Sequence, residues 1–174
     1  MRMSLLFSLI SLATLSLSSA SAALSDIEIK VTREKLGEEV DRKTSKAERV
    51  ATKEILYKIT IQSKTFKQLS NLEAKYMVFY YDSKPGSNYD PEEKSQSGSE
   101  KIIALASNRS VEFETKSITL TSVSLDGGWV YTTGASNKSK DRVSGVWVRV
   151  FGEDGTLVGE YANPSSITKR IWKD

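Results

Sequence analysis

Apolar and polar residues alternate in short stretches along this chain, and this period of two constrains its fold more than any other feature. Residues 27–32 place two isoleucines and a valine on one face and Glu, Lys and Thr on the other. Residues 55–62 and 146–151 repeat the pattern. Because successive side chains of a β-strand point to opposite faces, such alternation predicts strands with one buried face.

Turn-forming residues separate these stretches about every 8 to 12 residues, and no segment of helix length shows a period of 3.6. This spacing predicts an all-β fold, an antiparallel immunoglobulin-like or fibronectin-like sandwich of seven to nine strands, over residues 23–164. A slip in the alternation near Ser122 predicts a bulge or a strand break there. The predicted strands lie at 27–31, 55–62, 74–82, 101–106, 111–115, 117–125, 129–133, 146–151 and 156–161.

The clearest hairpin lies at residues 146–161, where the turn 152–155 reads Gly-Glu-Asp-Gly between two apolar runs. Asp-Gly in such a position is a strong local hairpin signal. If Arg149 points to solvent, Val146, Val148 and Val150 point inward, and Trp147 lies on the opposite face. Trp147 therefore covers a second apolar layer or marks a contact surface.

Three segments lack the alternation. Residues 34–46 are highly charged and are predicted to form a mobile loop, and residues 83–100 contain Pro, Gly, Asn and Ser and are predicted to form a long exposed loop. After Pro164 a strand cannot continue, so residues 165–174 are expected to form a C-terminal tail or one helical turn.

Residues 1–22 have the composition of a secretory signal peptide. A basic residue at Arg2 precedes an apolar run at 5–17, and small residues fill positions 19–22. That run is shorter than the roughly 20 residues needed to cross a bilayer as a helix, so we expect it to be removed. The protein is thus predicted to be exported to a periplasm or cell surface, without a transmembrane segment. The absence of cysteine favours a bacterial source and a core that relies on packing.

The charge of the chain and the residue types that it lacks argue against several classes of function. If Arg2 leaves with the signal, 24 basic and 22 acidic residues remain, and they are interspersed, which argues against nucleic-acid binding. The chain has no His and no Cys, so His-dependent triads, Cys nucleophiles and zinc sites with nitrogen or sulfur ligands cannot form. Ser166 and Lys169 match the S-x-x-K spacing, but the companion motifs of that enzyme class are absent. We therefore expect a protein that is not an enzyme.

No cofactor is expected. Four carboxylates in and beside the segment 83–100 offer the hard oxygen ligands that calcium prefers, although the spacing of a calcium-binding loop is missing. A solvated loop is the favoured interpretation, with a calcium site as the alternative. The four residues are Asp82, Asp90, Glu92 and Glu93.

Aromatic residues provide the candidate contact surface, which comprises Trp147, Trp129, Tyr131 and Tyr89. A flat aromatic strip on a sandwich can bind a sugar by stacking against the apolar face of its ring. Packing in the core is the alternative explanation for most of these side chains.

The sequence resembles the small exported immunoglobulin-like proteins encoded beside type IV pilus genes in verrucomicrobial gut bacteria. The resemblance covers residues 23–164 in general character, including the hairpin 146–161. It implies an accessory role in pilus assembly or surface attachment. The signal ends Ala-Ser-Ala, without the Gly-[Phe/Met]…Glu start of pilins, so the chain is not expected to be a pilin subunit.

Two functional hypotheses follow from the sequence. The first is a module that binds proteins of the envelope or surface, including pilus components, through loops carried on a rigid sandwich. The second is a glycan-binding module, with Trp147 and Trp129 as its stacking platform.

Overall fold

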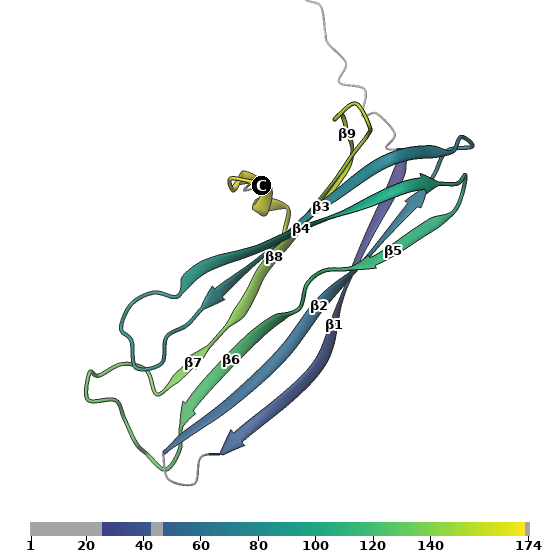
Figure 1. Ribbon diagram of the computed structural model, residues 1–174. Coiled ribbons are helices and arrows are strands. Elements are labelled where there is room, and N and C mark those ends of the chain that lie inside the picture. Colours follow the sequence, from purple (N-terminus) through teal and green to yellow (C-terminus); the bar gives the residue numbers. More distant parts are fainter. Residues whose placement is uncertain (1–25, 43–46, 173–174) are drawn as a thin grey trace, which may run out of the picture.

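The computed structural model describes residues 26–42 and 47–172, so the proposed signal peptide at 1–22 lies outside the described residues. The described chain is an antiparallel, all-β sandwich, which confirms the predicted fold class (Figure 1). Its elements are β1 (Ile27–Arg42), β2 (Glu48–Ser63), β3 (Leu69–Asp82), β4 (Glu92–Leu105), β5 (Ser110–Glu114), β6 (Ile118–Leu125), β7 (Lys138–Lys140), β8 (Arg142–Phe151), β9 (Leu157–Asn163) and the 3-10 helix η1 (Ser165–Lys169).

The strands form two sheets. In the first sheet the order is β1-β2-β6-β7, and β5 pairs with β2 beyond the end of β6. In the second sheet the order is β4-β3-β8-β9. Taking β1, β2 and β6 as strands A, B and E, and β4, β3, β8 and β9 as C′, C, F and G, this order matches the immunoglobulin-type division of strands. The chain passes from the first sheet to the second between β7 and β8, across the single residue Asp141.

The hydrophobic core lies between the two sheets. On β2, alternate residues point inward from Ile55 to Ile61, and on β8 the predicted inward face is confirmed, because Val146, Val148 and Val150 are all in the core. Leu120 of β6 is the last residue of that strand to join this core. Beyond it, the described side chains on the core-facing side of the first sheet are mostly charged or polar, with Val40 and Ala51 as the apolar ones, and the sandwich opens.

The segment 34–46 is not the loop that its charge predicts, because β1 continues to Arg42 and pairs with β2 as far as Arg49. Residues 43–46 lie outside the described residues. Backbone hydrogen bonds between the two strands do not depend on side-chain polarity, and the side chains described there are largely exposed. Charge therefore indicated exposure correctly and secondary structure wrongly.

Three further predictions are corrected. Residues 92–100 belong to β4 and pair with β3 at the edge of the second sheet, so the exposed loop spans only 83–91. The predicted strand 129–133 lies instead in a loop, 126–137, whose Gly127, Gly128 and Gly134 all have positive φ. The slip near Ser122 is no bulge, since β6 pairs with β2 in continuous register; a register shift occurs at Leu36 of β1.

A second apolar cluster covers the outer face of the second sheet. Met77, Phe79 and Trp147 point to this side, and Ile167 of η1 packs on them with 1% of its surface exposed. The residues after Pro164 thus form a helical turn that docks on the sheet, and Trp172 extends the cluster.

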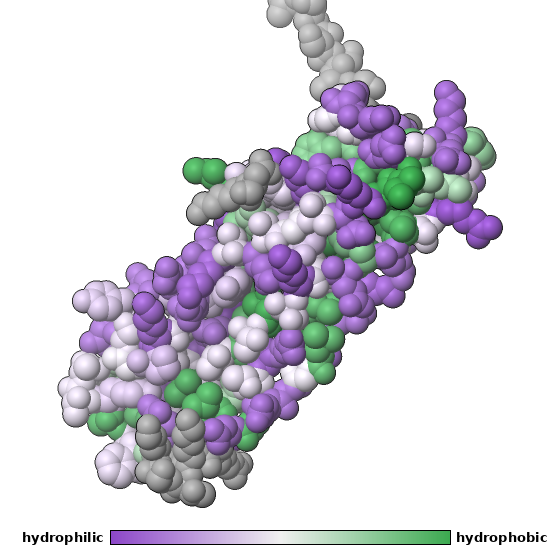
Figure 2. Space-filling view, in the orientation of Figure 1, coloured by the Kyte–Doolittle hydropathy of each residue, from purple (hydrophilic) through white to green (hydrophobic). Residues whose placement is uncertain are grey.

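No helix in the described part of the chain has the length and apolar character needed to cross a membrane. On the face seen in Figure 2, hydrophilic and hydrophobic residues are intermixed.

Candidate functional site

Two loops from different sheets lie side by side at one end of the sandwich (Figure 1). We call residues 83–91 and 126–137 together the loop platform. Asn88 Nδ2 donates a hydrogen bond to the Thr133 carbonyl oxygen at 3.0 Å, and Thr133 Oγ1 donates one to the Gly86 carbonyl oxygen at 3.0 Å. These bonds hold the two loops in one arrangement.

Tyr131 packs between the loops and the start of β2. Its ring lies so near Gly86 that a Cβ atom at that position would be 3.1 Å from Tyr131 Cδ1. Burial, together with the neighbouring Glu48 carboxylate, raises the pKa of Tyr131. Because its ring fills the space between the loops, Tyr131 supports the platform and offers only part of its surface to a ligand.

Three large side chains of the platform project into solvent. Tyr89 is 90% exposed, Val130 73% and Trp129 64%. Single exposed apolar residues are common on protein surfaces, but three on two adjoining loops form a group. The sequence identified Trp129 and Tyr89 from their residue type, whereas Val130 was missed because the candidate surface was sought among aromatic residues.

Trp147 is 1% exposed and lies away from the platform. Of its two predicted roles, it therefore covers a second apolar layer and does not mark a contact surface. Its Nε1 donates to Glu160 Oε1 at 2.9 Å. The Arg149 guanidinium lies 4.0 Å from its ring centroid, and Trp172 packs edge-on at 4.9 Å. The aromatic strip predicted from the sequence, with Trp147 beside Trp129, does not exist.

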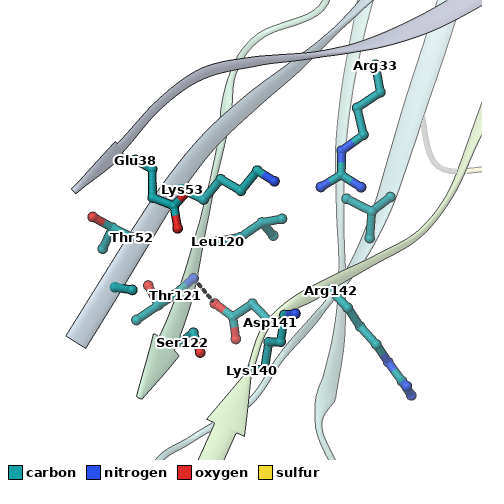
Figure 3. Close-up of a pocket in the computed structure, with 12 residues that line it drawn as sticks. Arg33, Glu38, Thr52, Lys53, Leu120, Thr121, Ser122, Lys140, Asp141 and Arg142 are labelled. Carbon is teal, nitrogen blue, oxygen red and sulfur yellow. Dashed lines mark hydrogen bonds between the residues drawn. The ribbon is translucent and has the colours of Figure 1, made fainter. Parts of the chain in front are cut away.

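A cavity of about 430 Å³ opens where the first sheet extends beyond the core, near the platform. We call it the basic cleft. In Figure 3, Lys53 of β2 and Leu120 of β6 extend to the side of the first sheet on which Arg33 of β1 lies. Lys140, Asp141 and Arg142 line the opposite edge. This site was not predicted from the sequence, because its residues are far apart in the chain and half of β1 was assigned to a loop.

Asp141 connects the two sheets at the edge of the basic cleft. Its Oδ1 accepts a hydrogen bond from the Ser83 backbone N–H at 2.8 Å, and its Oδ2 accepts one from the Thr121 backbone N–H at 2.8 Å (Figure 3 shows the second bond). Ser83 follows β3 of the second sheet, whereas Thr121 belongs to β6 of the first. One carboxylate thus fixes the end of the sandwich that carries both the platform and the cleft.

Of the four carboxylates considered for calcium, Asp82, Asp90 and Glu92 line one small pocket, and Glu93 does not. Asp82 forms an ion pair with Lys94, and Glu93 forms one with Arg170. Within residues 26–42 and 47–172, no three acidic side chains are grouped so that they could hold a metal ion.

No protein-family model matches this chain, and no curated protein does. Three solved structures are similar to it in part. A structural-genomics target has 11% identity and a TM-score of 0.35, covering 79% of this chain and 85% of that one. A Bordetella pertussis protein provisionally named ApaA has 10% identity and a TM-score of 0.28, covering 79% and 94%.

The third structure comes from Akkermansia muciniphila, with 14% identity and a TM-score of 0.27, covering 78% of this chain and 70% of that one. This organism is a verrucomicrobial gut bacterium, the group named by the sequence resemblance. TM-scores this low carry no argument about function for any of the three.

Proposed function

We propose that this protein is a non-catalytic binding module of the bacterial cell envelope that holds another protein through the loop platform. The observation that carries the proposal is the exposure of Tyr89, Trp129 and Val130 on two loops that hydrogen-bond to each other. Binding residues are frequently placed on loops that a rigid scaffold positions.

The chemistry of the platform suits a protein partner. Trp and Tyr are enriched among the residues that contribute most to protein–protein binding, since each buries a large area for few rotatable bonds. The contacts between Asn88, Thr133 and Gly86 order the loops before any partner arrives. Ordering beforehand lowers the entropy lost on association.

A role as an accessory protein of a type IV pilus is the more specific form of this proposal, and it rests on the sequence resemblance alone. Glycan binding is the second candidate. Trp129 and Tyr89 could stack on a sugar, but the burial of Trp147 removes half of the expected aromatic strip. The protein-binding function is therefore preferred.

Site-specific photocrosslinking in cells tests the proposal. A benzoylphenylalanine residue at position 130 would lie on the platform, and one at position 66 would replace Phe66, which is 92% exposed and lies outside the platform. We expect position 130, and not position 66, to crosslink to a defined envelope protein. Equal crosslinking at both positions, or none at 130, would contradict the proposal.

Purified components then separate the candidates. Replacing Tyr89 and Trp129 together by Ala should weaken binding to the crosslinked protein by at least about tenfold, since truncating such residues commonly costs more than 1 kcal/mol. The fold should be unchanged, because neither side chain is in the core. Quenching of Trp129 fluorescence by a glycan, with no effect of the double variant on protein binding, would instead favour the glycan function.

A further inference from the structure

The first sheet separates its charges by face beyond the core. Residues paired in the register share a face, and Ile55 and Leu120 mark the core-facing side. Among the side chains that the structure describes along this stretch, the core-facing side carries six basic residues and one acidic residue, whereas the opposite side carries five acidic residues and no basic one. The core-facing set is Arg33, Lys35, Glu38, Arg49, Lys53, Lys138 and Lys140, and the opposite set is Glu34, Glu39, Asp41, Glu48 and Glu54.

The register shift at Leu36 produces this separation on β1. Lys35 pairs with Ile55 and Gly37 pairs with Glu54, so Leu36 is an extra residue and the alternation changes phase. Without the shift, Glu39 and Asp41 would point to the basic side. With it, they point away, and Glu38 is the acidic residue of β1 that faces the basic cleft.

The acidic residues that line the basic cleft are already engaged. Glu38 forms an ion pair with Lys35, and the Asp141 carboxylate accepts the backbone N–H groups of Ser83 and Thr121. By contrast, within the described residues Arg33, Lys53 and Lys140 have no carboxylate close enough to form an ion pair. The Lys53 charge also acts on the Glu38 carboxylate at longer range, but the four basic residues that line the cleft outnumber the two acidic ones, so the cleft keeps a net positive charge.

A concave site between two sheets concentrates the field of such charges, because its protein walls have a low dielectric constant. Arg33 offers a guanidinium that can donate two parallel hydrogen bonds to one oxyanion, and the ammonium groups of Lys53 and Lys140 can each approach a further one. A long polyanion is disfavoured, since the opposite face of the same sheet is acidic.

We propose that the basic cleft binds a small ligand that carries two or more oxyanion groups, which can be phosphate, sulfate or carboxylate. This site is separate from the loop platform and does not depend on the function proposed for it. The groups in contact with the ligand are Arg33, Lys53 and Lys140, and Leu120 forms an apolar floor.

Isothermal titration at low ionic strength tests the site with three probes: tripolyphosphate, a trisulfated heparin disaccharide and citrate. We expect at least one to bind at a single site, with the preferred probe identifying the oxyanion. Affinity should fall as NaCl is raised, because Arg33 and Lys140 are exposed and Lys53 is half-buried. Absence of saturable binding by all three probes would overturn the proposal.

Matched variants separate a built site from general attraction to Lys and Arg. Lys53→Gln and Arg33→Gln should each weaken binding about tenfold, the loss expected for one charged hydrogen bond. Lys67→Gln removes the same charge from an exposed loop residue outside the cleft and should leave affinity within about twofold. If Lys67→Gln weakens binding as much as Lys53→Gln, while circular dichroism shows all variants folded, the cleft is not the site.

Discussion

Asp141 shows how much of this fold depends on one side chain. Its carboxylate accepts a backbone N–H from each sheet, and its own backbone N–H donates to the Thr121 carbonyl oxygen at 2.8 Å. Ser83 Oγ adds a bond to the Lys140 carbonyl oxygen at 3.0 Å. The crossover between the sheets is therefore fixed by hydrogen bonds, where the apolar core no longer reaches.

Replacing Asp141 by Ala leaves two partly buried N–H groups without an acceptor. We expect the free energy of unfolding to fall by about 2–4 kcal/mol, since each hydrogen bond to a charged group contributes about 1.5–3 kcal/mol and water recovers part of it. Urea denaturation measures the change. Asp90→Ala, at an exposed loop residue, serves as the control and should change stability by less than about 0.5 kcal/mol.

Glu112 tests whether the ion pair with Lys58 forms between the paired strands β2 and β5. The hydrogen bond and charge of Lys58 lower the pKa of the Glu112 carboxyl below its usual value. A carboxyl group whose pKa is lower in the folded state than in the unfolded state stabilises the fold at pH values above its unfolded pKa. This stabilisation is lost as the pH falls through the folded pKa. Carbon-detected NMR should show the Glu112 midpoint rising in Lys58→Met; an unchanged midpoint would contradict the assignment.

At the scale of elements, the docking of η1 depends on a glycine in β8. A Cβ atom on Gly145 would lie 2.7 Å from the Asn163 carbonyl oxygen and would overlap the Ile167 side chain. Real Cβ atoms do not approach so closely, so the close packing of β8, the end of β9 and η1 requires glycine at this position.

Gly145→Ala should therefore displace η1 from the second sheet. We expect faster tryptic cleavage at Lys169 and Arg170, together with a loss of stability of about 1–3 kcal/mol from overpacking. Gly37→Ala is the matched control, because its Cβ would meet nothing within 4 Å. Equal protease resistance of Gly145→Ala and the wild type would show that η1 does not need this close approach.

Over the whole molecule, the apolar core occupies one part of the sandwich and the charged extension of the first sheet occupies the other. The core holds alternate residues of β2 from Ile55 to Ile61 and the inward valines of β8, whereas residues 48–54 of β2 are half-buried or exposed. Regions with few buried apolar contacts open at lower free-energy cost. Native-state hydrogen exchange should thus be faster at residues 38–41 and 48–53 than at 57–61 and 146–150. Uniform protection across both parts would contradict this division.

How far the sequence specified the fold depended on whether apolar and polar residues alternate in each strand. The hairpin 146–161 and the inward valines were predicted because their signals lie within a few residues. The charged half of β1 and residues 92–100 of β4 were assigned to loops although each pairs with the next or preceding strand in the sequence, because both lie at sheet edges and carry polar side chains without an apolar alternation. The strand predicted at 129–133 has the residues of a strand but no neighbour to pair with.

For the candidate sites, the sequence showed residue types but not which side chains are buried or brought together. Trp129 and Tyr89 were identified from residue type and turn context, while the burial of Trp147 could not be known before η1 was seen on the second sheet. The basic cleft was not found at all. Its composition depends on the cross-strand register and on the extra residue at Leu36, and neither can be deduced from alternation alone.

The extra residue at Leu36 also limits how the gene for this chain can change. Point substitutions around it alter one side chain at a time, but losing or gaining a single codon between Arg33 and Glu38 would turn Glu39 and Asp41 toward Arg33 and cancel its positive potential. Natural variants that keep an oxyanion ligand should therefore differ in residue identity along this stretch and agree in its length.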